Sequence, residues 1–112
     1  MKKVLFYAMQ GEKMCFLHTL LNALDLAEAG HEVKIIFEGM SVKLVSVLEE
    51  EANPLYKKAK EEGLIAGICK ACSKVMEVYD KNQSYGLPML EDLKGHAGMK
   101  KYIEEGFLVV SL

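Results

Sequence analysis

The chain has 112 residues, of which 51% are hydrophobic and 27% are charged, and its formal net charge is −2. This length fits one domain spanning residues 1–112, and the hydrophobic content excludes an intrinsically disordered chain. The slightly negative charge excludes the basic surface that binding to nucleic acid or to an anionic membrane requires.

No apolar segment approaches the ~18 residues that a membrane-spanning helix needs. The apolar run 4–9 that follows Met1-Lys2-Lys3 ends at Gln10. It is shorter than the ~7–15-residue apolar region of a signal peptide, and no small-residue cleavage site follows it, so we interpret it as a strand. The three cysteines cannot all pair within one chain. We therefore expect a cytoplasmic protein whose thiols are reduced.

The first half of the chain alternates apolar strands with an amphipathic helix. Strands are predicted at 4–9 and 33–37, since both are continuous apolar runs typical of buried parallel strands. Between them, the spacing of apolar residues predicts a helix over 12–28 that ends at Gly30. Its predicted inward stripe consists of Met14, Leu17, Leu20, Leu21, Leu24 and Ala27.

The second half continues the alternation. Asn53-Pro54 is a helix start, because Asn caps helices and Pro is favoured at their first position. A third buried strand is predicted at 64–68, followed by a helix that begins near Cys69 and runs through about Tyr79. The other predicted segments are a short helix 42–48, a helix 53–62, a polar loop 81–86, an extended piece 87–90, a helix 97–105 and a last strand 107–110.

This order predicts the fold class and the edge that carries the site. Alternating strands and helices with continuously apolar strands indicate an α/β fold. We expect a three-layer α/β/α sandwich with a mainly parallel sheet of four to five strands. Ligands of such sheets bind beyond the carboxyl ends of the strands. The segments 10–14, 38–41 and 69–72 lie at that edge, and the candidate binding residues in or near them are Gln10, Gly11, Cys15, Gly39, Met40, Lys70 and His96.

Cys69 and Cys72 form a C-x-x-C pair where a buried strand meets a helix, and they are the candidate catalytic residues. Backbone N–H groups and the helix dipole favour an anion there, and Lys70 adds positive charge. We therefore expect an accessible thiol at position 69 with a lowered pKa, able to attack sulfur. The alternative is that both cysteines are small core residues.

Metal and cofactor binding are disfavoured by the sequence. A structural zinc site usually has four ligands, and here Cys15 and His96 would have to join the single C-x-x-C pair. A dinucleotide site would require three glycines after the first strand, and Gly11 is the one glycine there, although Glu38 ends the second strand as a ribose-binding acid would. We predict no metal site and no cofactor.

Three strings, in order, resemble the DsrE/DsrF-like sulfur-relay family: residues 29–39 (AGHEVKIIFEG), 67–72 (GICKAC) and 86–92 (GLPMLED). The similarity covers nearly the whole chain. It implies a three-layer α/β/α domain and a homo-oligomer, either a trimer or a hexamer. In the sulfur-relay members, a cysteine after the third strand carries a persulfide to a partner protein, and that role maps onto Cys69. Cys72 departs from members that have a single cysteine.

Three functions stay open on these grounds. The first is a sulfur carrier that holds a persulfide on Cys69 and exchanges it with sulfur donor and acceptor proteins. The second is a dithiol redox protein that uses Cys69 and Cys72. The third is a non-catalytic oligomeric binding module whose cysteines are merely packed.

Overall fold

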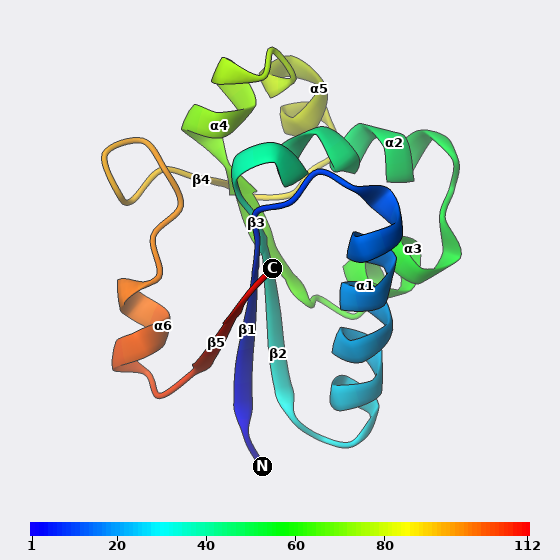
Figure 1. Ribbon diagram of the computed structural model, residues 1–112, viewed down its shortest axis with the longest axis vertical. Helices are drawn as coiled ribbons and strands as arrows, with labels where there is room; N and C mark the ends of the chain where they lie inside the picture. The colour runs from blue at the N-terminus through cyan, green and yellow to red at the C-terminus, as the bar shows by residue number, and fades with distance from the viewer.

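A computed structural model describes residues 1–112 and shows an α/β sandwich built around one parallel sheet (Figure 1). In Figure 1, α1 and α3 lie on one side of the sheet, α6 lies on the other, and α4 and α5 lie over the top. The longest helix, α1, has 16 residues, and no helix has the length and apolarity that crossing a membrane demands. The elements in chain order are β1 (Lys3–Ala8), α1 (Lys13–Glu28), β2 (Glu32–Phe37), a 3₁₀ helix η1 (Gly39–Lys43), α2 (Leu44–Glu50), α3 (Pro54–Glu61), β3 (Ile65–Cys69), α4 (Lys70–Val75), α5 (Tyr79–Ser84), β4 (Met89–Leu90), α6 (Lys100–Glu104) and β5 (Leu108–Ser111).

The sheet has five strands in the order β4-β3-β2-β1-β5, and every pair of neighbours is parallel. The predicted fold class is therefore confirmed. Strands β1 to β4 are added in one direction, and the chain then returns through α6 to place β5 beside β1. Because the sheet is parallel, the carboxyl ends of β1, β2 and β3 meet at one edge, where the segments after each strand come together.

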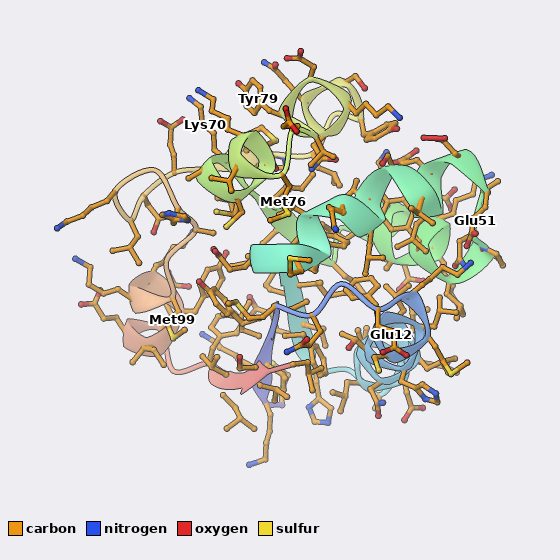
Figure 2. The ribbon with its side chains drawn as sticks, turned by 45° about the horizontal axis from the view of Figure 1, so that its top comes forward. Glu12, Glu51, Lys70, Met76, Tyr79 and Met99 are labelled. Carbon is orange, nitrogen blue, oxygen red and sulfur yellow. The ribbon has the colours of Figure 1, made fainter.

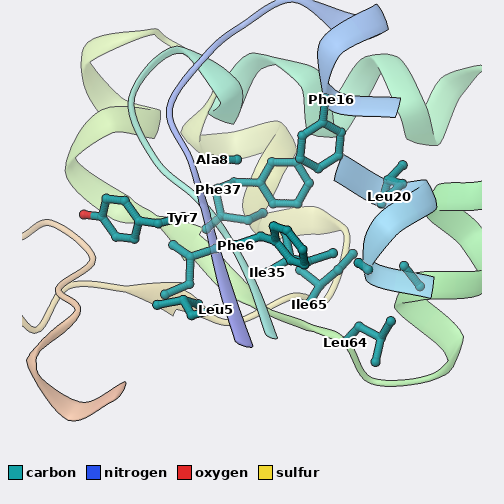
Figure 3. Close-up of a cluster of buried hydrophobic side chains, with 14 of the residues drawn as sticks. Leu5, Phe6, Tyr7, Ala8, Phe16, Leu20, Ile35, Phe37, Leu64 and Ile65 are labelled. Carbon is teal, nitrogen blue, oxygen red and sulfur yellow. The ribbon is translucent and has the colours of Figure 1, made fainter. Parts of the chain in front are cut away.

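The core lies mainly between the sheet and helices α1 to α3. Phe37 is fully buried and its ring lies 4.9 Å from that of Phe16, which anchors α1 to the sheet. Figure 3 shows this pair on one side of β1, with the Tyr7 hydroxyl pointing away from it. Successive side chains of β1 point to opposite faces of the sheet, so Phe6 lies on the side of α1 and Tyr7 on the other side.

The inward face of α1 differs from the predicted stripe. Leu20 is buried as predicted, together with Phe16 and Ala23, whereas Met14 is 68% and Leu21 48% exposed. The helix is rotated toward Phe16 because that ring packs against Phe37. The packing of Phe16 on Phe37, rather than the spacing of the apolar residues alone, therefore determines which face of α1 is buried.

The predicted helix from Cys69 through about Tyr79 is two short helices, α4 and α5, and the predicted polar loop 81–86 overlaps α5. The chain turns at Glu77, which has a positive φ of 60°, so α4 cannot continue. Asn82 makes α5 stable in this position: it is fully buried and donates to the Val42 carbonyl and the Ser73 hydroxyl. The predicted helix 97–105 is confined to Lys100–Glu104, and Ala97 before it is buried, with its carbonyl accepting from the Tyr7 hydroxyl.

Candidate functional site

Cys69 is the last residue of β3 and the N-cap of α4, and its Sγ accepts a hydrogen bond from the backbone N–H of Cys72 at 3.4 Å. Gly67 of β3 lets the chain that leads into β4 approach closely. A Cβ at Gly67 would lie 2.6 Å from the Pro88 carbonyl oxygen. Cys69 is fully buried, so the expectation of an accessible thiol at this position is wrong.

Cys72 carries the more exposed thiol of the pair. It lies in the first turn of α4 and is partly buried. Its Sγ donates to Oε1 of Glu38 at 2.8 Å and accepts from the backbone N–H of Gly39 at 3.3 Å. With Gly39, Met40, Val75, Met76 and His96, Cys72 lines a shallow pocket of about 200 Å³. This thiol is the sulfur that a molecule in the pocket would meet.

Glu38 follows β2 and brings a buried carboxylate to the two cysteines. Its backbone N–H donates to the Ser41 hydroxyl, and its own Oε1 accepts from Gly39 N, so a capping box fixes the start of η1. Gly39 has a φ of +57°, a conformation that favours glycine. Beyond Glu38, the Tyr7 hydroxyl donates to the Ala97 carbonyl at 2.7 Å and lies 3.2 Å from Oε2.

His96 reaches the cysteines from a tight turn over residues 93–96. Leu93 and His96 exchange two backbone hydrogen bonds of 2.8 Å each, and Lys94 and Gly95 between them both have positive φ. These φ values define a turn of the type that closes hairpins. The Gly95 carbonyl accepts from Ala71 N at 2.9 Å, which fastens the turn to the first residues of α4. The imidazole is thereby held beside both sulfurs.

Four side chains consequently converge from three parts of the chain: Glu38, Cys69, Cys72 and His96, which we call the tetrad. One ligand-type atom of each lies within 4.8 Å of the other three. Nδ1 of His96 is 3.3 Å from Sγ of Cys69, 3.4 Å from Sγ of Cys72 and 3.7 Å from Oε1 of Glu38. The arrangement offers two nucleophilic sulfurs, a carboxylate and an imidazole, all of which are also metal-binding groups.

The electrostatic environment of Cys72 opposes ionisation of its thiol. Burial raises the pKa of the Cys72 thiol to about 12, with further contributions from the hydrogen bonds to Glu38 and Cys69 and from the negative charge of Glu38. The Gly39 N–H opposes this rise. Lys70 does not compensate, because its amino group pairs with Glu91 at 3.3 Å on the outer side of α4 (Figure 2). Cys72 is therefore a neutral thiol hydrogen-bonded to a carboxylate.

The other predicted binding residues divide into two groups. Gly39, Met40 and His96 line the pocket beside Cys72, and Figure 2 labels Met76 at the same place, between α4 and the helices that follow β2. Gly11 packs closely against Met40, because a Cβ at Gly11 would lie 3.0 Å from the Cβ of Met40. Gln10 and Cys15 lie elsewhere, in a cavity of about 550 Å³ that is also lined by residues of α1 and β5.

Cys15 is therefore not part of the group in which the sequence analysis considered it as a fourth zinc ligand. Of the polar residues in the site, Glu38 and Tyr7 were not among the predicted site residues, and neither were Val75 and Met76, which line the pocket. Glu38 was visible at the end of the second strand, where it suggested a ribose-binding acid rather than a partner of the cysteines. Tyr7 gave no signal, because a tyrosine within a buried strand is typical of a core residue.

No model of a known protein family and no solved structure matches the chain. The uncharacterized protein MJ0733 of Methanocaldococcus jannaschii is 37% identical over 111 residues, which cover 96% of this chain and 88% of that protein. An identity of this size over nearly the full length of both proteins indicates common descent. The chain belongs to the same protein family as this uncharacterized protein.

Proposed function

We propose that the chain is a small sulfur carrier that holds a persulfide on its C-x-x-C pair and passes it to a partner protein. The observation that carries the proposal is the placement of the Cys72 thiol in a shallow pocket, 2.8 Å from the Glu38 carboxylate and next to a second thiol. The resemblance to sulfur-relay proteins supports the same chemistry. It assigns the persulfide to Cys69, but the burial of that residue favours Cys72 as the sulfur that meets the donor.

The transfer follows from the contacts of Cys72. Glu38 accepts the thiol proton, and the Cys72 sulfur attacks the outer sulfur of a donor persulfide. A new S–S bond forms as the donor's S–S bond breaks, and the donor leaves as a thiol after taking back the proton from Glu38. No net oxidation or reduction occurs. Delivery is the same exchange, with the acceptor thiol attacking the outer sulfur on Cys72.

Intact-mass measurement of the reduced, metal-free protein after incubation with glutathione persulfide tests this function. We expect the wild-type chain to gain one sulfur atom, Cys72→Ser to gain none, and the matched control Cys15→Ser to behave as the wild type. A folded wild-type protein that gains no sulfur overturns the proposal. Uptake that survives in Cys72→Ser overturns the assignment to that residue.

A dithiol redox function is the second candidate, favoured by the closeness of the two sulfurs within the tetrad. It requires a reversible Cys69–Cys72 disulfide. Titration with oxidised glutathione, followed by alkylation and mass measurement, separates the two functions. A disulfide that forms and is reduced reversibly, together with no uptake of sulfane sulfur, supports the redox function and contradicts the carrier.

The proposed partners are a protein that donates sulfur, a protein that accepts it, and further copies of the chain. We place this chemistry in the cytoplasm, where thiols are kept reduced and persulfides are exchanged between thiols rather than locked in disulfides. The pocket rim is suited to protein contact, because Met40 is 45% and Val75 72% exposed beside Cys72.

A further inference from the structure

The four side chains of the tetrad hold their ligand atoms at separations close to those in a metal site. A tetrahedral zinc site has Zn–S distances of about 2.3 Å and Zn–N and Zn–O distances of about 2.0–2.2 Å, so neighbouring donor atoms lie roughly 3.3–3.8 Å apart. Nδ1 of His96 lies 3.3 Å and 3.4 Å from the two sulfurs and 3.7 Å from Oε1 of Glu38. The imidazole nitrogen is therefore already spaced from the other three donors as in a zinc site.

All four donor atoms lie within 4.8 Å of one another, and Sγ of Cys72 lies 2.8 Å from Oε1 of Glu38. This contact is shorter than in a zinc site because a thiol proton bridges the two atoms. A metal ion that replaces the proton would move the sulfur and the oxygen apart. The ion would thus take the place of the thiol proton between Sγ of Cys72 and Oε1 of Glu38.

We propose that Glu38, Cys69, Cys72 and His96 bind one Zn²⁺ ion with tetrahedral geometry. Two thiolates, an imidazole and a carboxylate form a donor set that suits zinc, since the sulfurs exclude Mg²⁺ and Ca²⁺, which prefer oxygen ligands. This ligand set differs from the one weighed in the sequence analysis, because Glu38 takes the place considered there for Cys15. It also replaces the prediction that the chain has no metal site.

The surroundings of the tetrad support the donors as metal ligands. Each sulfur accepts a backbone N–H: Cys69 from Cys72 at 3.4 Å, and Cys72 from Gly39 at 3.3 Å. The second carboxylate oxygen of Glu38 faces the Tyr7 hydroxyl at 3.2 Å. Such outer contacts orient metal ligands and stabilise their charged forms.

Charge and burial favour a cation in the same place. Cys69 is fully buried and the Glu38 side chain is 8% exposed. The nearest lysine in sequence, Lys70, is paired with Glu91 and does not contact the tetrad. A divalent ion would provide there a positive charge that Lys70 does not.

Zinc binding and sulfur loading exclude each other, because both occupy the sulfur of Cys72. This consequence rests on the proposed sulfur-carrier function, whereas the metal site itself rests on the donor geometry alone. Zinc would then control when the carrier is available for loading.

Cobalt titration of the reduced, chelator-treated protein tests the metal site. We expect one Co²⁺ per chain to give the intense visible bands of tetrahedral cobalt and a thiolate-to-cobalt charge-transfer band, both of which Zn²⁺ abolishes. Cys72→Ser, His96→Ala and Glu38→Gln should each lower the affinity at least tenfold, since losing a ligand costs at least as much as losing one of its outer contacts. His96 has an exposed side chain, so His96→Ala tests a ligand without opening the core.

Cys15→Ser and Glu91→Gln are the matched controls, since both change exposed residues of the same types outside the tetrad. Their affinities should equal that of the wild type. The proposal is overturned if folded wild-type protein gives no tetrahedral cobalt spectrum, or if His96→Ala and Cys72→Ser leave the spectrum unchanged. Sulfur uptake by metal-free protein that does not bind cobalt rejects the metal site alone. Cobalt binding without any uptake of sulfur rejects the sulfur carrier alone.

Discussion

Cys72 combines partial exposure with an environment that opposes its ionisation. Burial raises the pKa of its thiol to about 12, and Glu38 adds a hydrogen bond and a negative charge in the same direction. A free thiol has a pKa of about 8.5, so Cys72 is far less ionised at neutral pH than its place near the start of a helix would indicate. Burial and, after it, Glu38 therefore keep the reactivity of this thiol with a simple alkylating reagent low.

Glu38→Gln should raise the rate of Cys72 alkylation by iodoacetamide about tenfold at pH 7–8, because loss of the carboxylate lowers the pKa of the thiol. The rate is measured by mass spectrometry in the Cys15→Ser variant, which lacks the exposed Cys15 thiol that would also react with iodoacetamide. Glu104→Gln, a change on exposed α6, is the control and should leave the rate unchanged. An unaltered or slower rate in Glu38→Gln would contradict the role assigned to its charge.

The residues of the site were only partly predictable from the sequence. Cys69, Cys72 and His96 stood out because few side chains carry their chemistry and the C-x-x-C spacing is local. The contact of His96 with the sulfurs is made 24 residues or more along the chain and depends on the Leu93–His96 turn. The sequence indicates such a turn poorly, since Lys94 adopts a positive φ that is unusual for lysine.

At the scale of the elements, the strands were predictable and the short helices were not. Buried parallel strands are continuous apolar runs, and this signal is local. The break between α4 and α5 depends on Glu77 and on the buried hydrogen bonds of Asn82, which form only in the folded chain. A polar sequence at 81–86 therefore predicted a loop where tertiary contacts form a helix.

Helices α2 and α3 are joined by a polar contact that makes stability depend on pH. The Glu49 carboxylate accepts from the Tyr56 hydroxyl at 2.7 Å and from the Lys60 ammonium at 2.6 Å. Burial alone would raise the pKa of Glu49, but the hydrogen bonds from Lys60 and Tyr56 and the charge of Lys60 lower it overall. Since the folded pKa lies below the unfolded one, this stabilisation is present above about pH 4.3 and is lost as the pH falls through the folded value.

Glu49→Gln should lower the free energy of unfolding by about 1 kcal/mol at pH 7, and the difference from the wild type should shrink as the pH falls below about 4. Urea unfolding of both proteins at several pH values measures this difference in the free energy of unfolding. Glu62→Gln is the control, because its pair with Lys58 is long, at 3.9 Å, and exposed, and such pairs contribute 0–1 kcal/mol. A stability difference between Glu49→Gln and the wild type that grows toward low pH would contradict a folded-state pKa of Glu49 below the unfolded one.

At the scale of the whole molecule, the two sides of the sheet are covered unequally. The 16-residue α1 and α3 cover one side, whereas the five-residue α6 lies on the other. The strand β5 pairs with β1 and leaves its outer edge free. Exposed apolar side chains gather along this part of the chain: Met99 at 37%, Ile103 at 55%, Leu108 at 63% and Leu112 at 45%.

A free strand edge flanked by apolar side chains favours self-association, and a second copy of the chain would cover both. We predict a homo-oligomer that sediments faster than a monomer at micromolar concentration in analytical ultracentrifugation. Leu108→Lys should shift it toward the monomer, because the charge would be buried in the contact. The control Leu21→Lys, on the exposed side of α1, should leave the oligomer intact. A single monomeric species for the wild type would contradict the prediction, and dissociation by Leu21→Lys alone would place the contact on α1 instead.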